Sequence, residues 1–239
     1  ASADLSNSDK TEGFLKKTKA LEKGDFSGRF LQAGVSELTM GALATGMALH
    51  GGVIPVCATF FAFSDYMKPV LRVAALMEQP VKFMWTHDAF RVGEDGPTHQ
   101  PIEQEAQLRL LEKLNNHSGK SSMIALRPAD SSETVAAWKS MMETNDRPTG
   151  LILSRQGIAD LPSYTSESRL EVSMKLNKGG YILKDVENPE VILLANGSEV
   201  STLHSAIEEL SKKYRTRIVS VPSEGLFREQ SADYQAKVL

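Results

Sequence analysis

The chain has 239 residues and carries 27 Lys and Arg against 30 Asp and Glu, which gives a formal net charge of −3. This balance excludes the basic surplus typical of nucleic-acid binding, so any anionic ligand must be recognised by a few placed side chains. No apolar run approaches the ~20 residues of a membrane span and no signal peptide is found, so we expect a cytoplasmic protein.

The first part of the chain is predicted to be a linker followed by an α/β domain. Residues 1–27 are polar, with no sustained apolar period and one helical turn near Phe14. Residues 28–157 alternate amphipathic stretches with short, unbroken apolar runs, which predicts helices alternating with strands. The predicted helices are 35–49, 64–77, 102–115 and 131–143, and the predicted strands are 53–59, 81–85, 123–127 and 150–154.

Strands that are unbroken apolar runs indicate an α/β fold with a parallel sheet covered by helices on both faces. In such sheets the loops after the carboxyl ends of the strands form the ligand crevice. We therefore expect residues 59–66, 86–99 and 154–156 to lie at one edge. The single cysteine, Cys57, lies in the first apolar run, which predicts a buried thiol and a reducing compartment.

A second α/β unit, residues 179–239, is predicted after a polar linker at 158–178. A unit of this size buries too little apolar surface to be stable alone, so we expect a truncated domain. Because neither end of the chain has a closing element, we expect a piece of a longer polypeptide. The elements predicted in the second unit are strands within 179–186, 191–195 and 217–221 and a helix at 198–213.

The loop from Thr86 to Pro101 concentrates groups that can carry chemistry. Its two histidines and three acidic residues directly follow a predicted strand, and its glycines and prolines restrict the path of the backbone. Histidine is suited to proton transfer near neutral pH. The alternatives are an ordinary solvated loop and a zinc site, but no cysteine or helical histidine pair supports His87 and His99 as zinc ligands.

The run Gly-Glu-Asp-Gly-Pro-Thr-His-Gln-Pro within His87–Pro101 resembles the signature of transketolases. One such motif is weak evidence, but further motifs of the family follow in order along nearly the whole chain. The set predicts a transketolase, which transfers two-carbon ketol units between sugar phosphates in the pentose phosphate pathway. The further motifs are Ser2–Leu5, Gly34–Ala42, Thr59–Phe63, Arg127–Asp130, Ser154–Gln156, Gly179–Tyr181 and Gly197–Val200.

The resemblance implies thiamine diphosphate as cofactor and Glu37 as the residue that activates it. A carboxyl group bonded to the pyrimidine ring nitrogen favours the imino tautomer of the cofactor, which removes the proton from the thiazolium carbon. This role requires a carboxyl group in a largely apolar pocket. From spacing alone, Glu37 near a predicted helix start fits an exposed helix face equally well.

Four further residues match the cofactor site of the family. The aromatic wall around the pyrimidine ring is matched by Phe60, Phe63 and Tyr66. Aromatic side chains suit this role because flat rings stack on them at little entropic cost. Without the resemblance these three residues would be predicted as core. Asp4 matches an acidic residue near the cofactor at the subunit junction.

The resemblance also implies a subsite for the substrate phosphate. His99 and Arg155 match residues that bind this group, and Arg suits the role because its planar fork bonds phosphate oxygens in pairs. Ser8 matches a further phosphate contact, although its neighbours Asn7 and Asp9 replace the Pro and Asn that are usual in the family.

Two more residues match positions that contact the sugar. Asp95 matches a carboxylate that bonds a sugar hydroxyl and helps to select its stereochemistry. His87 matches a residue that faces the bound sugar near the reaction centre, which makes it a candidate catalytic residue together with Glu37.

Other charged residues fall outside the functional pattern of the family. Arg91 stands where many members have glycine, and it is either a lineage variation or an extra anion contact. A basic run near the N-terminus is predicted to be a solvated face rather than a binding patch. This run consists of Lys10, Lys16, Lys17 and Lys19.

Half of the family's site is missing from this sequence. Transketolases bind the cofactor diphosphate and a divalent metal, Mg²⁺ or Ca²⁺, through a Gly-Asp-Gly motif and a later Asn in an N-terminal domain, and the sequence lacks that motif. The resemblance implies a homodimer with the active site at the subunit interface. We therefore expect this chain to supply the pyrimidine-binding half, to hold no metal ligands and to be inactive alone.

Three alternatives remain open. Deoxyxylulose-phosphate synthase and the 2-oxo-acid dehydrogenase β subunit share the glutamate and the fold, but Glu94–Pro101 and Ser154–Gln156 favour transketolase. Dihydroxyacetone synthase is closer in sequence and harder to separate. The third alternative is not an enzyme but a non-catalytic assembly module. Such a module would be expected to have degenerate site residues, which the sequence does not show.

Overall fold

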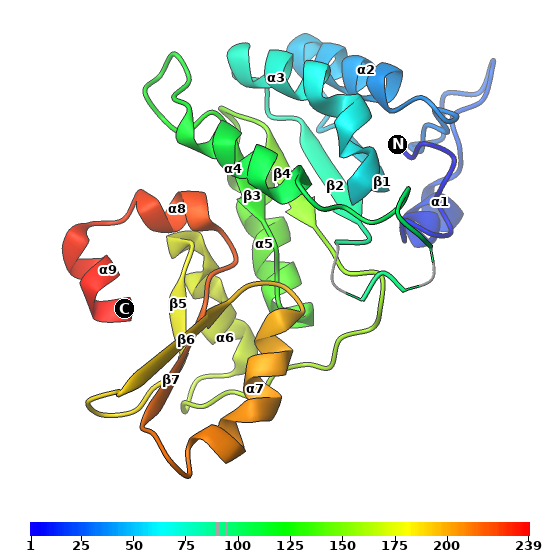
Figure 1. The fold of residues 1–239 in the computed structure, drawn as a ribbon. Helices are drawn as coiled ribbons and strands as arrows, with labels where there is room; N and C mark the ends of the chain where they lie inside the picture. Colours follow the sequence, from blue (N-terminus) through cyan, green and yellow to red (C-terminus); the bar gives the residue numbers. More distant parts are fainter. Residues whose placement is uncertain (89–90, 94) are drawn as a thin grey trace. The chain divides into compact units, whose positions relative to one another are not determined.

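The computed structural model describes residues 1–88, 91–93 and 95–239, which form two compact units (Figure 1). Unit 1 consists of residues 1–123 and 144–155, and unit 2 consists of residues 124–143 and 156–239. Within the described part of the chain, no helix combines the length and the apolar character that crossing a membrane requires.

The core of unit 1 is a parallel sheet, as the unbroken apolar runs predict. Strand β1 (Val56–Phe60) pairs with β2 (Lys82–Thr86), and β2 pairs with β4 (Thr149–Ile152). Every residue of β2 and β4 is buried, which explains why these strands read as continuous rather than alternating apolar runs. Cys57 on β1 is free and fully buried, which confirms the predicted buried thiol.

The helices of unit 1 follow the predicted order. In the predicted helix 64–77, a 3₁₀ segment ends at Met67 and the α-helix has Pro69 in its first turn, where a missing N–H costs nothing. The helical elements are α1 (Glu12–Thr18), α2 (Glu37–His50), η1 (Phe61–Met67), α3 (Lys68–Leu76) and α4 (Gln104–Lys113).

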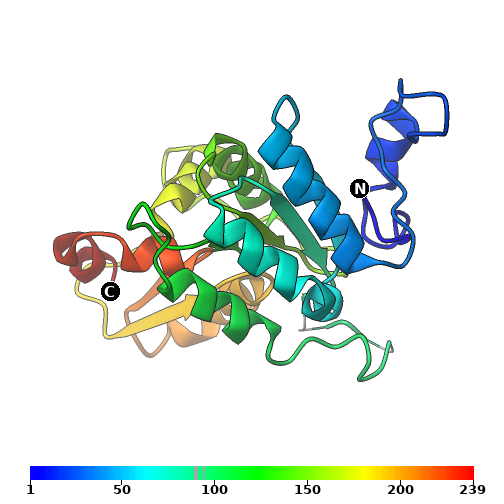
Figure 2. The same ribbon diagram turned by 90° about the horizontal axis from the view of Figure 1, so that it is seen from above.

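Helix α2 packs closely against α3 (Figure 2). Gly41 permits this approach, because a Cβ atom at this position would lie 2.4 Å from Cγ2 of Val70. The α2 helix also contacts β1, which brings its first turn against the sheet. This packing fixes the position of Glu37, the first residue of α2.

The N-terminal residues bond along β1 instead of running free. The N–H of Ala58 donates to the carbonyl of Ala1 at 3.0 Å, and the N–H of Ala3 donates to the carbonyl of Ala58 at 3.3 Å. Ser2 also forms a parallel bridge with Gln32. The start of the chain is therefore held at the edge of the sheet in unit 1.

Unit 2 contains a mixed three-stranded sheet in the order β5-β7-β6, with β5 antiparallel and β6 parallel to β7. Its main apolar cluster includes Leu183, Val200 and Ile218. The elements are β3 (Ile124–Leu126), α5 (Ser131–Glu143), α6 (Arg169–Ser173), η2 (Met174–Lys178), β5 (Tyr181–Lys184), β6 (Val191–Ala195), α7 (Glu199–Leu210), β7 (Thr216–Ser220), α8 (Glu224–Arg228) and α9 (Ala232–Val238).

Two parts of unit 2 differ from the sequence prediction. The loop character predicted for the end of the linker is wrong, because α6 and η2 occupy it. Ser168 caps α6 through a reciprocal capping box with Glu171, a helix start signal within a stretch that is polar enough to resemble a loop. The last two helices, α8 and α9, were not predicted, and each begins after a capping serine, Ser223 and Ser231.

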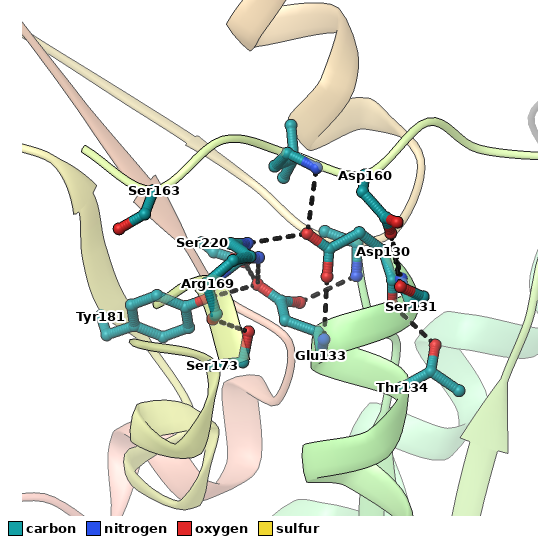
Figure 3. Close-up of polar contacts among 12 residues, drawn as sticks. Asp130, Ser131, Glu133, Thr134, Asp160, Ser163, Arg169, Ser173, Tyr181 and Ser220 are labelled. Carbon is teal, nitrogen blue, oxygen red and sulfur yellow. Dashed lines mark hydrogen bonds and ion pairs between the residues drawn. The ribbon is translucent and has the colours of Figure 1, made fainter. Parts of the chain in front are cut away.

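A buried polar network ties the helices of unit 2 to its sheet (Figure 3). Glu133 on α5 accepts hydrogen bonds from the hydroxyls of Tyr181 on β5 and Ser220 on β7, and it pairs with Arg169 of α6 at 3.1 Å. Arg169 also pairs with Asp130 at 2.7 Å. Because each carboxylate has several hydrogen-bond or ion-pair partners, its burial is compatible with a stable fold. Burial also raises the pKa of the Tyr181 hydroxyl.

Candidate active site

A cavity of about 450 Å³ opens in unit 1 at the carboxyl end of the parallel sheet. Its walls come from the N-terminal segment and from the loops that follow β1, β2 and β4. All three stretches expected at the crevice edge contribute to it, because parallel strands end on the same side. The lining residues are Asn7, Ser8, Lys10, Phe60, His87, Asp95, His99 and Arg155.

His87 directly follows β2 and is 5% exposed. Its backbone has a φ of +64°, a left-handed conformation that costs a side-chain-bearing residue free energy and is typical of functional positions. The Nδ1 atom lies 3.0 Å from the hydroxyl of Thr86. Burial lowers the pKa of His87, which Asp95 opposes and Arg155 reinforces. The imidazole is therefore mainly neutral at pH 7 and can accept a proton.

Asp95 lies between two basic groups of the cavity. One of its oxygens lies 3.8 Å from Nε2 of His87 and 3.3 Å from Nε of Arg155. Arg155 keeps about half of its side chain exposed, so its guanidinium remains accessible to a ligand. The three residues form a connected group that presents both a carboxylate and a cation to the cavity.

An aromatic cluster extends outward from Phe60 and His99, which line the cavity. Phe60 stacks on His87 and on Phe63, with ring centroids 3.8 Å and 5.7 Å apart. The edge of His99 meets Phe63 at a centroid distance of 5.2 Å. Tyr66 continues the row at 6.0 Å from Phe63 and is 62% exposed. The residues predicted as an aromatic wall are thus contiguous, and their outer end is open.

Glu37 lies in the first turn of α2 and contacts Thr59, the residue before Phe60 on β1. Its side chain is 6% exposed and accepts a hydrogen bond from the hydroxyl of Thr59 at 3.1 Å. Thr59 precedes Phe60 on β1, so the carboxyl group is held one residue away from the aromatic wall. The exposed-face reading of Glu37 is wrong. Glu37 is not among the described residues that line the cavity.

The N-terminal segment brings one predicted residue to the cavity and leaves another outside. Ser8 lines the cavity, and its hydroxyl donates to the side chain of Asn7 at 3.2 Å. Asp4 is exposed, has a φ of +64° and is not a lining residue. The two residues are thus separated in this structure, although the sequence places them four positions apart.

The structure adds Lys10 and Asn7 to the candidate site. Lys10 is exposed, as the predicted solvated basic face requires, and it also lines the cavity with Ser8 and Arg155. Its position two residues after Ser8 was the available sequence signal. Arg91, in contrast, is exposed, does not line the cavity and has a φ of +64°, a conformation that glycine adopts without strain.

Glu94 of the signature lies outside the described residues, as do Ala89 and Phe90. Among residues 1–88, 91–93 and 95–239, no three His, Cys, Asp or Glu side chains gather as a metal site would require.

Family models match both parts of the chain. Residues 1–159 match "Transketolase, pyrimidine binding domain", and residues 179–239 match "Transketolase-like TK C-terminal domain". A transketolase of Halalkalibacterium halodurans is 45% identical over 240 residues, and one of Bacillus subtilis is 42% identical over 241 residues. Each match covers 100% of this chain but 34% of the relative, so the chain spans about a third of these relatives.

Solved structures give the same result. Transketolase from Leishmania mexicana has a TM-score of 0.87 at 34% identity, covering 100% of this chain and 33% of that chain. A structure described as "Split gene transketolase, inactive beta4 tetramer" has a TM-score of 0.67 at 27% identity, covering 92% of this chain and 63% of that chain. The parallel α/β fold of unit 1 is thus the fold of the proteins that the chain resembles.

Proposed function

Because the chain belongs to the transketolase family, we propose that it supplies the pyrimidine-binding half of a transketolase active site. The reaction is transfer of a two-carbon ketol unit from a ketose phosphate, such as xylulose 5-phosphate, to an aldose phosphate. The observation that carries the proposal is the convergence of the loops after three parallel strands on one cavity, beside the buried Glu37. The domains are 28–157 and 179–239, joined by 158–178 and preceded by the linker 1–27.

Thiamine diphosphate fits the arrangement of Glu37 and the aromatic wall. Thiamine diphosphate supplies a carbanion-stabilising centre when bound. The flat faces of Phe60 and Phe63 suit its pyrimidine ring, and Tyr66 extends the wall. The carboxyl group of Glu37 would bond the ring nitrogen of the cofactor, and the hydroxyl of Thr59 orients that carboxyl group. Asp4 places an acidic side chain near the cofactor at the subunit junction.

The cavity residues have complementary roles toward the sugar phosphate. The Nε2 atom of His87 takes or returns a proton near the reaction centre, because its lowered pKa keeps the ring neutral. Asp95 accepts a hydrogen bond from a sugar hydroxyl while it orients Arg155. Arg155, His99 and Ser8 bind the phosphate group.

The remaining half of the site comes from another polypeptide segment. We infer that an N-terminal transketolase domain supplies the diphosphate contacts and the divalent metal, Mg²⁺ or Ca²⁺, and that the complete enzyme is a cytoplasmic homodimer. The chain covers 34% of its transketolase relatives, which leaves room for such a domain. A related structure carries the description of an inactive split-gene assembly, which supports inactivity of the isolated half.

The test is reconstitution of activity. The purified 239-residue chain would be assayed for ketol transfer alone and after mixing with a separately expressed N-terminal transketolase domain, thiamine diphosphate and Mg²⁺. We expect no transfer by the chain alone and transfer by the mixture. Transfer by the isolated chain would contradict the half-site assignment. Association and cofactor binding without transfer would favour a non-catalytic assembly module.

A further inference from the structure

Among the described residues that line the cavity, Lys10 is the charged one to which the proposed function gives no role. It lines the cavity together with Ser8, His99 and Arg155. Its positive charge acts on His87, since it is one of the groups that lower the pKa of that imidazole. Lys10 is therefore electrostatically coupled to the candidate catalytic residue, and the other lysines of its basic run do not line the cavity.

The segment that carries Lys10 is rigidly anchored. The preceding residue, Asp9, is fully buried, and its carboxylate accepts hydrogen bonds from the hydroxyl of Ser2 and from both the N–H and the hydroxyl of Thr11. The N–H groups of Ser8 and Asp9 donate to the carbonyl of Leu5 at 2.8 and 2.7 Å. Hydrogen bonds thus hold the residues immediately before and after Lys10, which limits where its backbone can lie.

The backbone of Lys10 is also set in a defined conformation. Its φ is +67°, which is unfavourable for a residue with a side chain and persists only where neighbouring contacts enforce it. Ser2 links this turn to β1, because it forms a bridge with Ala58. The position of Lys10 at the cavity is therefore built into unit 1.

The described residues that line the cavity carry more positive than negative charge. Among the described lining residues, the carboxylate of Asp95 is set against two basic side chains, Lys10 and Arg155. Asp95 lies 3.3 Å from Arg155 and is shared with His87 at 3.8 Å. The charge of Asp95 is therefore committed to these two groups, which leaves the described lining residues with a net positive charge that suits a dianion.

We propose that Lys10 binds the phosphate group of the sugar-phosphate substrate and makes this chain selective for phosphorylated over unphosphorylated sugars. The proposal rests on the proposed function. An ammonium group is a compact point charge that complements the fork of Arg155, so the two cations approach the phosphate from different walls of the cavity. The cofactor diphosphate is the other source of the same chemistry, and the test separates the two.

The first experiment uses the 239-residue chain alone, with inorganic phosphate as the probe. The imidazole NMR signals of His87 and His99 would be followed during a phosphate titration at about pH 8, where the dianion dominates. We expect Lys10→Met to weaken phosphate binding about tenfold and Lys10→Arg to retain it. Lys17→Met removes an equal charge from an exposed position of the same basic run and should bind as the unmodified chain does.

Equal weakening by Lys10→Met and Lys17→Met would overturn the proposal, since it would show a general effect of net charge. Unchanged binding in Lys10→Met, or no binding of phosphate by the unmodified chain, would overturn it too. This titration needs neither cofactor nor partner domain, so its failure is distinguishable from failure of the reconstitution assay.

The second experiment assigns the phosphate to its source in the reconstituted mixture. We expect Lys10→Met to raise KM for xylulose 5-phosphate about tenfold, while KM for unphosphorylated xylulose and the affinity for thiamine diphosphate stay unchanged. A weaker affinity for thiamine diphosphate, with equal effects on the two sugars, would assign Lys10 to the cofactor and overturn its role in substrate selection.

Discussion

The imidazole ring of His87 stacks on the phenyl ring of Phe60, with the ring centroids 3.8 Å apart. The two residues come from the ends of neighbouring strands, because Phe60 pairs with Thr86 in the parallel register of β1 and β2. The stacking covers one face of the imidazole and joins the aromatic wall to the group formed by Asp95 and Arg155. The sheet register thus sets the geometry of the candidate site.

The stacking predicts a change in the titration of His87. Burial is the largest cause of its lowered pKa, so Phe60→Ala should raise this pKa toward the ordinary value of 6.5. An NMR pH titration of the imidazole signals measures this directly. Phe63→Ala is the matched control, because Phe63 contacts His99 and Phe60 instead of His87. Equal shifts in both variants would contradict the role given to the stacking.

The charges around His87 predict two opposite shifts. Asp95 raises the pKa of His87 and Arg155 lowers it. Asp95→Asn should therefore lower this pKa further, and Arg155→Met should raise it. The same NMR titration measures both variants. Shifts of one sign in both would show that the effect comes from a rearranged loop instead of from charge.

The network of unit 2 predicts a large loss of stability on breaking it. Glu133→Gln removes a buried carboxylate that faces Arg169 and should lower the free energy of unfolding by about 3 kcal/mol in urea denaturation. Glu143→Gln, at the exposed end of the same helix, should change it by less than about 0.5 kcal/mol. Similar values for the two variants would show that Glu133 contributes no more than a surface charge.

Lys82 predicts a pH dependence of stability. Burial lowers its pKa from 10.5 to about 8, and its ammonium group bonds to the carbonyl of Thr144. From about pH 8 to 10.5 the folded state has released this proton and the unfolded state still binds it, so stability due to Lys82 rises with pH. Below about pH 8 both states are charged, and this contribution is constant.

The comparison with Lys82→Met isolates this contribution. The difference in the free energy of unfolding between the unmodified chain and Lys82→Met should shift by up to about 3 kcal/mol in favour of the unmodified chain between about pH 7 and pH 10. Urea denaturation at several pH values measures it. A difference that is independent of pH would show that Lys82 titrates alike in both states.

The strands and the cavity loops were predictable from sequence because a single physical rule governs each. Continuous burial makes β2 and β4 read as unbroken apolar runs, and parallel pairing brings the ends of such strands together. These rules place residues 86–99 and 154–156 at one edge of the sheet, and the resemblance to transketolases marks His87, Asp95 and Arg155 within these stretches. The distances of 3.8 Å from Asp95 to His87 and 3.3 Å from Asp95 to Arg155 follow from the tertiary structure.

Other features depend on contacts that no local pattern encodes. Lys10 lines the cavity because buried Asp9 anchors its turn and residues 1–3 bond along β1, yet its sequence neighbours are polar. The burial of Glu37 results from the packing of α2 on the sheet. The spacing of residues in the sequence fits a buried and an exposed Glu37 equally well. The capping box at Ser168 starts a helix in a segment whose composition predicts a loop.

We propose that this chain holds the pyrimidine-binding half of a transketolase site and that Glu37 is its activating residue. The most direct measurement is ketol transfer from xylulose 5-phosphate by the chain mixed with an N-terminal transketolase domain, thiamine diphosphate and Mg²⁺, for the unmodified chain and for Glu37→Ala. The exposed Glu22→Gln is the matched control. We predict that Glu37→Ala lowers kcat at least about a hundredfold with domain association unchanged and that Glu22→Gln leaves it unchanged. Full activity of the Glu37→Ala mixture would contradict the account.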